Sequence, residues 1–448
     1  MHGGDYNRGL FLHSLLMPEA LIESLDHEGR GVAHVDDKVI FIEGALPGER
    51  VTFQSYHRKP RYEQAAAMSI LRESSQRVTP QCPHYGVCGG CSMQHMSVSA
   101  QIAAKQRVLE DALWHIGKLR PDEVYAPISG PAWGYRYRAR FSARHVEKKG
   151  GVLVGFHEKR RTYVAEMDGC AVVPHEISVL LTPLKRMIEG LSEPNRFPQI
   201  ELAIGDTQKV LVLRNLVPLT AADEQRLRDF ADSHQIVWYL QPRGPATVQL
   251  FHPADAPPLS YSLPEFGLTL RFGPTEFTQV NHGVNRLLVR RAMNLLQPQA
   301  GERVADMFCG LGNFTLAIAR LGAQVVGIES SRELVERARS NAALNDLSAL
   351  TEFGVVNLFE TTAERLAALG RFDKMLIDPP RDGAVALINA LRDDTPRRIV
   401  YVSCKPSTLA RDAAILVHER GYHLRGVGIA NMFPHTSHVE SIAMFERQ

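Results

Sequence analysis

The second half of the chain alternates short apolar runs with segments of helical periodicity, and this alternation constrains the fold more than any other feature of the sequence. Strands and helices that alternate in this way form a parallel sheet covered by helices on both faces. The last two runs, residues 422–429 and 439–445, have no helix between them and predict an antiparallel hairpin on the edge of the sheet. We therefore expect residues 276–448 to form one Rossmann-like α/β domain. Its parallel strands are predicted at residues 303–308, 325–329, 374–377 and 399–403.

The 448 residues exceed the usual size of one hydrophobic core, so the chain is expected to be multidomain. Residues 12–70 contain short strand-like runs separated by turn signals, a pattern typical of a small, OB-like β-barrel. Residues 71–275 combine a cysteine-rich loop, a helical pattern at 101–116 and strands from Tyr135 onward, which predicts a central α+β domain. The proline-rich segment 253–264 is typical of a linker.

A net charge of +2 excludes a uniformly basic nucleic-acid coat, so any RNA binding must depend on local patches. Arg136, Arg138 and Arg140 fall at every second residue, and a strand would present them on one face, either to a phosphate backbone or to solvent. No apolar stretch is long enough to span a bilayer, and the N-terminus lacks a secretory signal. We therefore expect a cytoplasmic protein without a membrane partner. In a reducing compartment its six cysteines are expected to hold a metal or do chemistry.

The first predicted strand of the α/β domain leads into a loop, residues 306–315, that contains Gly310 and Gly312. Glycine lets the backbone approach a ligand closely. Glu329 ends the next strand about twenty residues later, where dinucleotide folds use a carboxylate to bind ribose hydroxyls. The loop lacks the third glycine of the dinucleotide fingerprint and the Gly-Lys-Ser/Thr of a phosphate loop. This favours S-adenosylmethionine over NAD or ATP, the alternative being a tight turn without a ligand.

Two further strand ends carry reactive side chains. Asp378 precedes two prolines, which prevent helix continuation and hold the acid at the carboxyl end of its strand, where ligands bind in open α/β sheets. Cys404 ends the next strand, directly before a helix whose N-terminal amides would favour the thiolate. Taken singly, the aspartate is explained as a cap and the cysteine as a small buried hydrophobe. Combined with the nucleotide loop, they make Cys404 a candidate nucleophile.

A thiol is the group that methylation of uracil at C5 requires. C5 is a poor nucleophile, but a thiolate added at C6 makes an enolate whose C5 attacks the methyl of a sulfonium. The adduct must then lose its C5 proton and expel the thiolate, so a general base is needed. Glu440, in the predicted terminal hairpin, is the best placed acid, although alone it would be interpreted as a strand-surface charge.

Four cysteines lie outside the α/β domain, three of them close together around Gly89 and Gly90. Four thiolates suit zinc or an iron-sulfur cluster. A zinc ribbon usually offers two close pairs, whereas three close cysteines with one distant partner favour the iron-sulfur cluster. The alternative, unliganded buried thiols, fits so tight a group poorly. The four are Cys82, Cys88, Cys91 and Cys170.

Taken together, these motifs resemble the RNA uracil-C5-methyltransferase family over nearly the whole chain. Residues 29–32 and 47–51 match the TRAM domain, which is the N-terminal barrel of this family. The most specific motifs are the cysteine loop from Pro80 to His95, Phe308-Cys-Gly-Leu-Gly-Asn-Phe314, Asp378-Pro-Pro-Arg381, Ser403-Cys404-Lys-Pro406 and the final His438-Val-Glu440.

The resemblance implies a class I methyltransferase domain, S-adenosylmethionine as methyl donor and a four-iron, four-sulfur cluster. Cys404 would be the nucleophile and Glu440 the base. The barrel and the cysteines together imply 23S ribosomal RNA as substrate, because the shorter ribosomal paralogue lacks the barrel and the bacterial transfer-RNA enzyme lacks the cluster. No obligate protein partner is implied. The cluster would be held by Cys82, Cys88, Cys91 and Cys170, and adenosylmethionine would contact Gln279, Phe308, Asn313, Glu329, Asn357 and Asp378.

Three alternatives stay open. The target uracil would lie in transfer RNA or at another site of 23S RNA. A methyltransferase acting on an amino group of adenine or guanine also uses an acid or amide before two prolines, but it typically places an aromatic residue where this chain has Arg381, and it needs no thiol. A non-enzymatic iron-sulfur module that binds RNA or senses redox state would leave the cofactor loop and the nucleophile without a purpose.

Overall fold

The computed structural model describes residues 17–391 and 396–447, and it divides the chain into two compact units whose boundary falls between Val78 and Thr79. Residues 12–16, the start of the predicted barrel, lie outside the described residues. Residues 71–78 of the predicted central region belong to the first unit, and the rest of it belongs with the predicted C-terminal region to the second unit. Among the described residues, no helix has the length and apolar character needed to cross a membrane.

The first unit is a six-stranded sheet in the order β1-β5-β6-β4-β3-β2. Only Ile22 and Glu23 separate its two edge strands, β1 and β2. The Ile22 amide donates a hydrogen bond to the Glu49 carbonyl beside β5, and the Glu23 amide donates one to the Val32 carbonyl in β3. The edges therefore close on each other, and the unit is the small barrel that the turn pattern predicted. The strands are β1 (Glu19–Leu21), β2 (Ser24–Leu25), β3 (Gly31–Val35), β4 (Lys38–Glu43), β5 (Arg50–Arg58) and β6 (Tyr62–Arg72).

The second unit contains a mixed six-stranded sheet in the order β13-β12-β11-β10-β8-β9. The pair β11–β12 is parallel because helix α4 (Ala221–His234) crosses over between the two strands, and the other pairs are antiparallel. Helix α3 (Leu181–Glu189) shares with this sheet a core that includes Phe141 and Trp238. The strands are β8 (Arg138–Val146), β9 (Gly151–Gly155), β10 (Gln199–Ile204), β11 (Lys209–Arg214), β12 (Val237–Gln241) and β13 (Gln249–His252).

The proline-rich segment is only partly a connection. Its end forms β14 (Ser260–Leu263), which pairs with β15 (Leu268–Arg271) in a two-stranded sheet. Alternate residues of this hairpin, including Tyr261 and Leu270, are buried in the core of the α/β region. The linker prediction was wrong for these residues, because three of the prolines precede the strand and Pro264 follows it, so none interrupts it.

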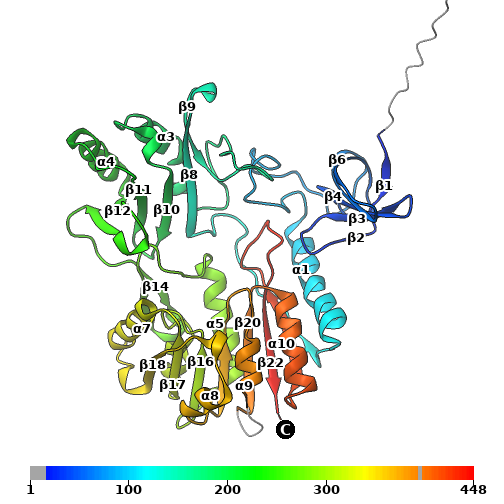
Figure 1. Ribbon diagram of the computed structural model, residues 1–448, viewed down its shortest axis with the longest axis vertical. Coiled ribbons are helices and arrows are strands. Elements are labelled where there is room, and N and C mark those ends of the chain that lie inside the picture. Colours follow the sequence, from blue (N-terminus) through cyan, green and yellow to red (C-terminus); the bar gives the residue numbers. More distant parts are fainter. Residues whose placement is uncertain (1–16, 392–395, 448) are drawn as a thin grey trace, which may run out of the picture. The chain divides into compact units, whose positions relative to one another are not determined.

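An eight-stranded sheet in the order β18-β17-β16-β19-β20-β22-β21-β7 forms the α/β region (Figure 1). The sequence did not predict the fifth parallel strand, β18 (Thr351–Val355), because this edge strand is half-exposed and carries no apolar run. The four predicted parallel strands are confirmed as β16 (Arg303–Met307), β17 (Gln324–Glu329), β19 (Lys374–Ile377) and β20 (Arg398–Ser403).

The predicted terminal hairpin is confirmed as β21 (His423–Ala430) and β22 (Glu440–Glu446). β22 pairs with β20, and the edge itself is taken by the short β7 (Glu123–Val124), which runs parallel to β21. Helix α1 (Val98–Ala112) packs against β21 and α10 (Pro406–His418), so this part of the predicted central region lies against the α/β sheet.

Helices cover both faces of the α/β sheet, as the alternating pattern predicted. In β20, Val400 and Val402 join one core with α5 (His282–Leu296), while Ile399 and Tyr401 join the other with α10. Because successive side chains of a strand point to opposite faces, one buried strand serves both cores. The remaining helices are α6 (Thr315–Arg320), α7 (Arg332–Leu344), α8 (Ala363–Ala368) and α9 (Val385–Ala390).

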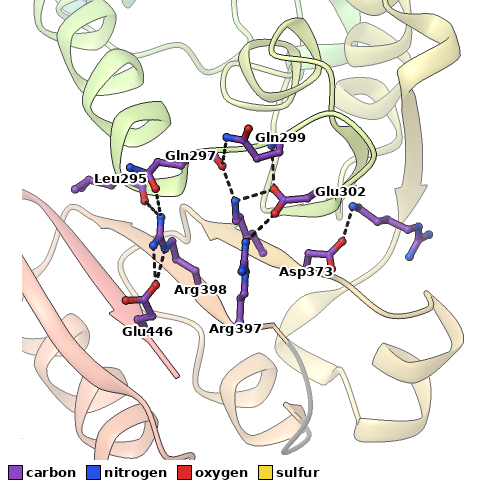
Figure 2. Close-up of polar contacts among 10 residues, drawn as sticks. Leu295, Gln297, Gln299, Glu302, Asp373, Arg397, Arg398 and Glu446 are labelled. Atoms are coloured by element: carbon purple, nitrogen blue, oxygen red, sulfur yellow. Dashed lines mark hydrogen bonds and ion pairs between the residues drawn. The ribbon is translucent and has the colours of Figure 1, made fainter. Parts of the chain in front are cut away.

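Ion pairs join the amino ends of the parallel strands and the carboxyl end of β22, opposite the ends that carry the predicted site (Figure 2). Glu302 accepts hydrogen bonds from Lys374 of β19 at 2.7 Å and from Arg397 at 2.9 Å, and Arg398 of β20 pairs with Glu446 of β22 at 2.6 Å. These contacts tie β16, β19, β20 and β22 together at one edge. The carboxyl edge is left for the functional site.

Candidate active site

The loop after β16 has the backbone shape that its glycines permit. Gly310 and Gly312 have φ angles of +56° and +96°, and Phe308 has +67°. The Gly310 amide donates a hydrogen bond to Glu329 Oε2 at 3.2 Å, while Oε1 of Glu329 accepts from the Ser331 amide at 3.0 Å. The Glu329 carboxylate is therefore held at the end of β17, directly beside the loop.

Residues that follow β18 lie next to the same carboxylate. The Val356 amide donates to the Glu329 carbonyl at 3.0 Å, and Asn357 comes next in the chain. Asn357 is exposed, and its side chain accepts a hydrogen bond from the Phe359 amide. The ring centroids of Phe308 and Phe359 are 5.6 Å apart. Three of the predicted adenosylmethionine contacts, Phe308, Glu329 and Asn357, thus lie on adjoining loops.

Asn313 belongs to a reciprocal amide pair that the sequence did not reveal. Its side chain exchanges two hydrogen bonds with Asn285 of α5, at 2.9 and 3.0 Å, and also accepts one from the Tyr261 hydroxyl. Asn285 lies fully buried among apolar neighbours of α5, and a polar residue on the apolar face of a helix was the available signal. Gln279, half-buried, precedes this helix, which Asn281 caps by accepting a hydrogen bond from Val284.

Asp378 lies at the end of β19, where its amide donates to the Met307 carbonyl. Burial, together with the nearby Asp306, raises the pKa of Asp378 to about 7. The proline turn that follows is anchored by Asp412 of α10, a buried carboxylate that accepts hydrogen bonds from the Ala384 amide and the Tyr401 hydroxyl, each at 2.7 Å. Asp412 was not among the predicted site residues, although it is a lone acid on the apolar face of a helix.

Cys404 and Glu440 occupy adjoining positions of two paired strands. Ser403 is the register partner of Ser441, so the next residue on each strand, Cys404 on one and Glu440 on the other, stands beside the last pair. Burial raises the pKa of the Cys404 thiol to about 11, and the carboxyl groups of Glu440 and Asp378 act in the same direction. Burial and the Asp378 carboxyl also raise the pKa of Glu440 well above its usual range.

The prediction that the surroundings of Cys404 favour its thiolate was therefore wrong. Cys404 does precede α10, but the half-buried thiol faces two carboxyl groups. The loss of hydration and the neighbouring acids outweigh the partial positive charge of the helix end. The free thiol is consequently protonated at neutral pH.

The four remaining predicted residues, Cys82, Cys88, Cys91 and Cys170, line one small pocket. Cys88 and Cys170 are buried, and burial raises the pKa of Cys91 to about 12. Within residues 17–391 and 396–447, no three His, Cys, Asp or Glu side chains converge as ligands of a single metal ion. The structure thus brings the distant Cys170 to the cysteine loop, with the thiols spaced around a pocket.

The predicted basic face of Arg136, Arg138 and Arg140 is not formed as a free surface. Arg138 is turned into the protein, where it donates to the Pro274 carbonyl at 3.1 Å and burial lowers its pKa. Arg140 pairs with Glu201 of β10 at 2.9 Å. Other segments supply partners for Arg138 and Arg140, and Arg136, which precedes β8, donates to the Arg138 carbonyl at 3.0 Å.

Comparison with known proteins places these features in a family. The model of the tRNA (uracil-5-)-methyltransferase family matches residues 261–448, and that of the TRAM domain matches residues 18–54. A protein of Aromatoleum aromaticum named 23S rRNA (uracil(1939)-C(5))-methyltransferase RlmD is 62% identical over 96% of this chain and 100% of its own length. A protein of the same name from Dechloromonas aromatica is 58% identical over 96% of this chain and 100% of its length.

Among solved structures, the fold is shared by the Pyrococcus abyssi tRNA (uracil-54, C5)-methyltransferase in complex with S-adenosyl-L-homocysteine. The similarity covers 96% of this chain and 100% of that one, with a TM-score of 0.73 and 23% identity. The similarity is thus not confined to the α/β region.

Proposed function

The chain belongs to the RlmD family of 23S rRNA (uracil-C5)-methyltransferases, and from this membership we propose that it methylates C5 of the uracil equivalent to position 1939 in 23S ribosomal RNA. The enzyme class, a methyltransferase dependent on S-adenosylmethionine, follows from the family. The proposal concerns the base, its position and the way in which this chain's own residues act on it.

One observation carries the proposed chemistry: Cys404 and Glu440 adjoin each other at the ends of β20 and β22, with Asp378 close enough to raise the pKa of both. A thiol and an acid in one place suit a reaction that needs a nucleophile first and a base afterwards. A methyltransferase acting on an amino group of adenine or guanine would need neither a thiol nucleophile nor a base beside it.

In the proposed reaction Cys404 gives its proton to water, and its sulfur, as the thiolate, forms a bond to C6 of the uracil. The electron pair of the C5–C6 double bond moves toward O4, and the resulting enolate makes C5 nucleophilic. S-adenosylmethionine supplies the methyl group that C5 takes up. Glu440, as the carboxylate, then removes the C5 proton, the double bond re-forms and the thiolate leaves. The raised pKa of Glu440 makes its carboxylate a stronger base than an exposed glutamate.

The residues around the β16 loop fit the methyl donor. Glu329 is positioned for ribose hydroxyls, and the φ angles of Gly310 and Gly312 give the open backbone that a nucleoside needs. Phe308 and Asn357 border the same loop. Asn313, which is held by its hydrogen bonds with Asn285, is a further proposed contact of adenosylmethionine. Gln279 and Asp378 complete the proposed contacts.

The cysteine pocket fits a four-iron, four-sulfur cluster better than a single ion. Four thiols line it, and the imidazole of His84, also in the lining, is hydrogen-bonded to Asp168. The thiols are spaced around the pocket without converging on a point. A cluster separates its cysteine ligands more widely than one ion does, because each thiolate binds a different iron. Burial raises the pKa of Cys88 to about 11, so these thiols need bound metal to become thiolates.

The experiment that tests the function uses total RNA, with both 23S ribosomal RNA and transfer RNA, from a strain lacking the gene, together with radiolabelled S-adenosylmethionine and the purified protein. We expect one labelled 5-methyluracil, at the position equivalent to 1939. Label in transfer RNA, at another 23S uracil or on an exocyclic amine would reject the proposed substrate.

A further inference from the structure

The loop between β21 and β22, residues 431–439, is held by segments that lie far away in sequence and ends at Glu440 (its red trace rises from β22 in Figure 1). The His435 carbonyl accepts hydrogen bonds from the amides of Ser92 and Met93, at 2.9 and 3.0 Å. The Trp133 ring stacks on the His435 ring with 3.8 Å between the centroids. The cysteine loop, which runs from Pro80 to His95, therefore reaches the 431–439 loop through Ser92 and Met93.

Helix α1 directs two buried polar side chains at the same 431–439 loop. Gln101 is fully buried and Lys105 is 2% exposed. Being four residues apart, they lie on one face of the helix. Gln101 accepts a hydrogen bond from the His435 amide at 2.8 Å and donates to the Met93 carbonyl at 3.0 Å, so it joins the cysteine loop to the 431–439 loop.

Lys105 holds the beginning of the loop. Its Nζ donates to Asn431 Oδ1 and to the Phe433 carbonyl, both at 2.8 Å. A buried ammonium group costs free energy, and an apolar residue would pack in its place without that cost. Burial accordingly lowers the pKa of Lys105 to about 7. Its specific contacts, and not a general need for core stability, explain a lysine at this position.

We propose that Gln101 and Lys105 are positioning residues for the reaction, which fix the 431–439 loop and thereby hold Glu440 beside Cys404. This inference rests on the proposed function, since it concerns the proposed base. Among the described residues, the hydrogen bonds of these two side chains go to Met93, Met96 and the 431–439 loop, so we expect the binding of adenosylmethionine to be independent of them.

The test compares Gln101→Met, which keeps the size of the side chain but removes its hydrogen bonds, with Glu110→Gln on the exposed side of the same helix. With 23S RNA and labelled adenosylmethionine, Gln101→Met should lower kcat by about 10²-fold, because a small displacement of a reacting group is enough for such a loss. The Kd of adenosylmethionine should be unchanged. A denaturation-resistant protein-RNA species carrying the labelled methyl should accumulate, since methyl transfer precedes the step that needs Glu440. Glu110→Gln should match the wild type.

Lys105→Met should behave as Gln101→Met does. If Gln101→Met no longer binds adenosylmethionine, we take that variant to be unfolded and use Ser92→Ala in its place. That variant removes only the acceptor for the Ser437 amide. Normal turnover in the folded variants, or a fall in kcat without the trapped species, would overturn the positioning role. Absence of C5 methylation by the wild type would instead reject the proposed function, so the two failures are distinguishable.

Discussion

Ser441 donates a hydrogen bond from its hydroxyl to the carbonyl of Ser403 at 3.0 Å, across the last register pair of β20 and β22. Both serines are buried, so this bond ties together the strand ends that lead to Cys404 and Glu440. The proposed nucleophile and base thus depend on one strand pairing for their proximity.

Cys404 and Glu440 should fail at different steps. Cys404→Ala should abolish both the covalent adduct and methylation, because C5 is not activated without addition at C6. Glu440→Gln should still transfer the methyl group and then stall, since the C5 proton cannot be removed. The measurement is a denaturing gel of protein with 23S RNA and labelled adenosylmethionine. Rapid turnover by Glu440→Gln, or an adduct formed by Cys404→Ala, would contradict the assigned roles.

The Cys404 thiol should react slowly at neutral pH. Because burial and the carboxyl groups of Glu440 and Asp378 raise its pKa to about 11, its thiolate fraction rises with pH throughout the neutral range. Alkylation of the Cys404 peptide by iodoacetamide, followed by mass spectrometry, should accelerate roughly tenfold per pH unit below that pKa. Glu440→Gln should shift the profile to lower pH, since it removes one opposing carboxylate. A rate that is already constant at pH 7 would show a thiolate at rest.

Protein purified without oxygen should be brown and contain iron with little zinc. Bridging sulfides and thiolates absorb broadly in the visible range, and metal analysis gives the stoichiometry. Cys170→Ser should reduce both iron and soluble yield, because cluster binding and local folding are coupled. Cys309→Ser serves as the control, since Cys309 lies in the β16 loop and not in the cysteine pocket. Stoichiometric zinc in a colourless protein would reject the cluster.

Glu302→Gln should lower stability near neutral pH and much less in acid. Burial alone would raise the pKa of Glu302, but the hydrogen bond and charge of Lys374, with further help from Arg397, lower it. A carboxylate whose folded pKa is depressed stabilises above its unfolded pKa of about 4.3, and this contribution is lost as pH falls through the folded value. We expect the free energy of unfolding, measured in urea at pH 7, to fall by about 2 kcal/mol, which is typical of hydrogen bonds to charged groups.

The matched control for this ion pair is Glu352→Gln, whose carboxylate is 76% exposed and lies 3.7 Å from Arg303. An exposed pair contributes about 0.5 kcal/mol or less, so this variant should unfold near the wild-type midpoint. Equal losses in the two variants, or a Glu302→Gln effect that does not shrink in acid, would contradict the assigned role of the Glu302 ion pairs.

Local patterns along the chain were enough to identify the α/β region and the edge that carries the site. Strand periodicity located β16, β17, β19 and β20, and the loops directly after them placed Phe308, Asp378 and Cys404 at their carboxyl ends. These inferences succeed because a strand and the turn that follows it are covalently continuous, so their geometry is determined by neighbouring residues. β18 and β14 were not predicted. β18 is an exposed edge strand and β14 lies among prolines, and both conditions weaken the local signal.

Tertiary structure decided everything that depends on distant partners. The pairing of β20 with β22 brings Glu440 to Cys404, and the packing of α1 brings Gln101 to His435. The thiol that was expected to ionise readily is instead held protonated, because the pKa of a side chain depends on burial and on charges from other elements. Sequence by itself determined which groups are present and on which strand end each lies; long-range packing determined which of them meet and in what protonation state, because neither quantity is a property of neighbouring residues.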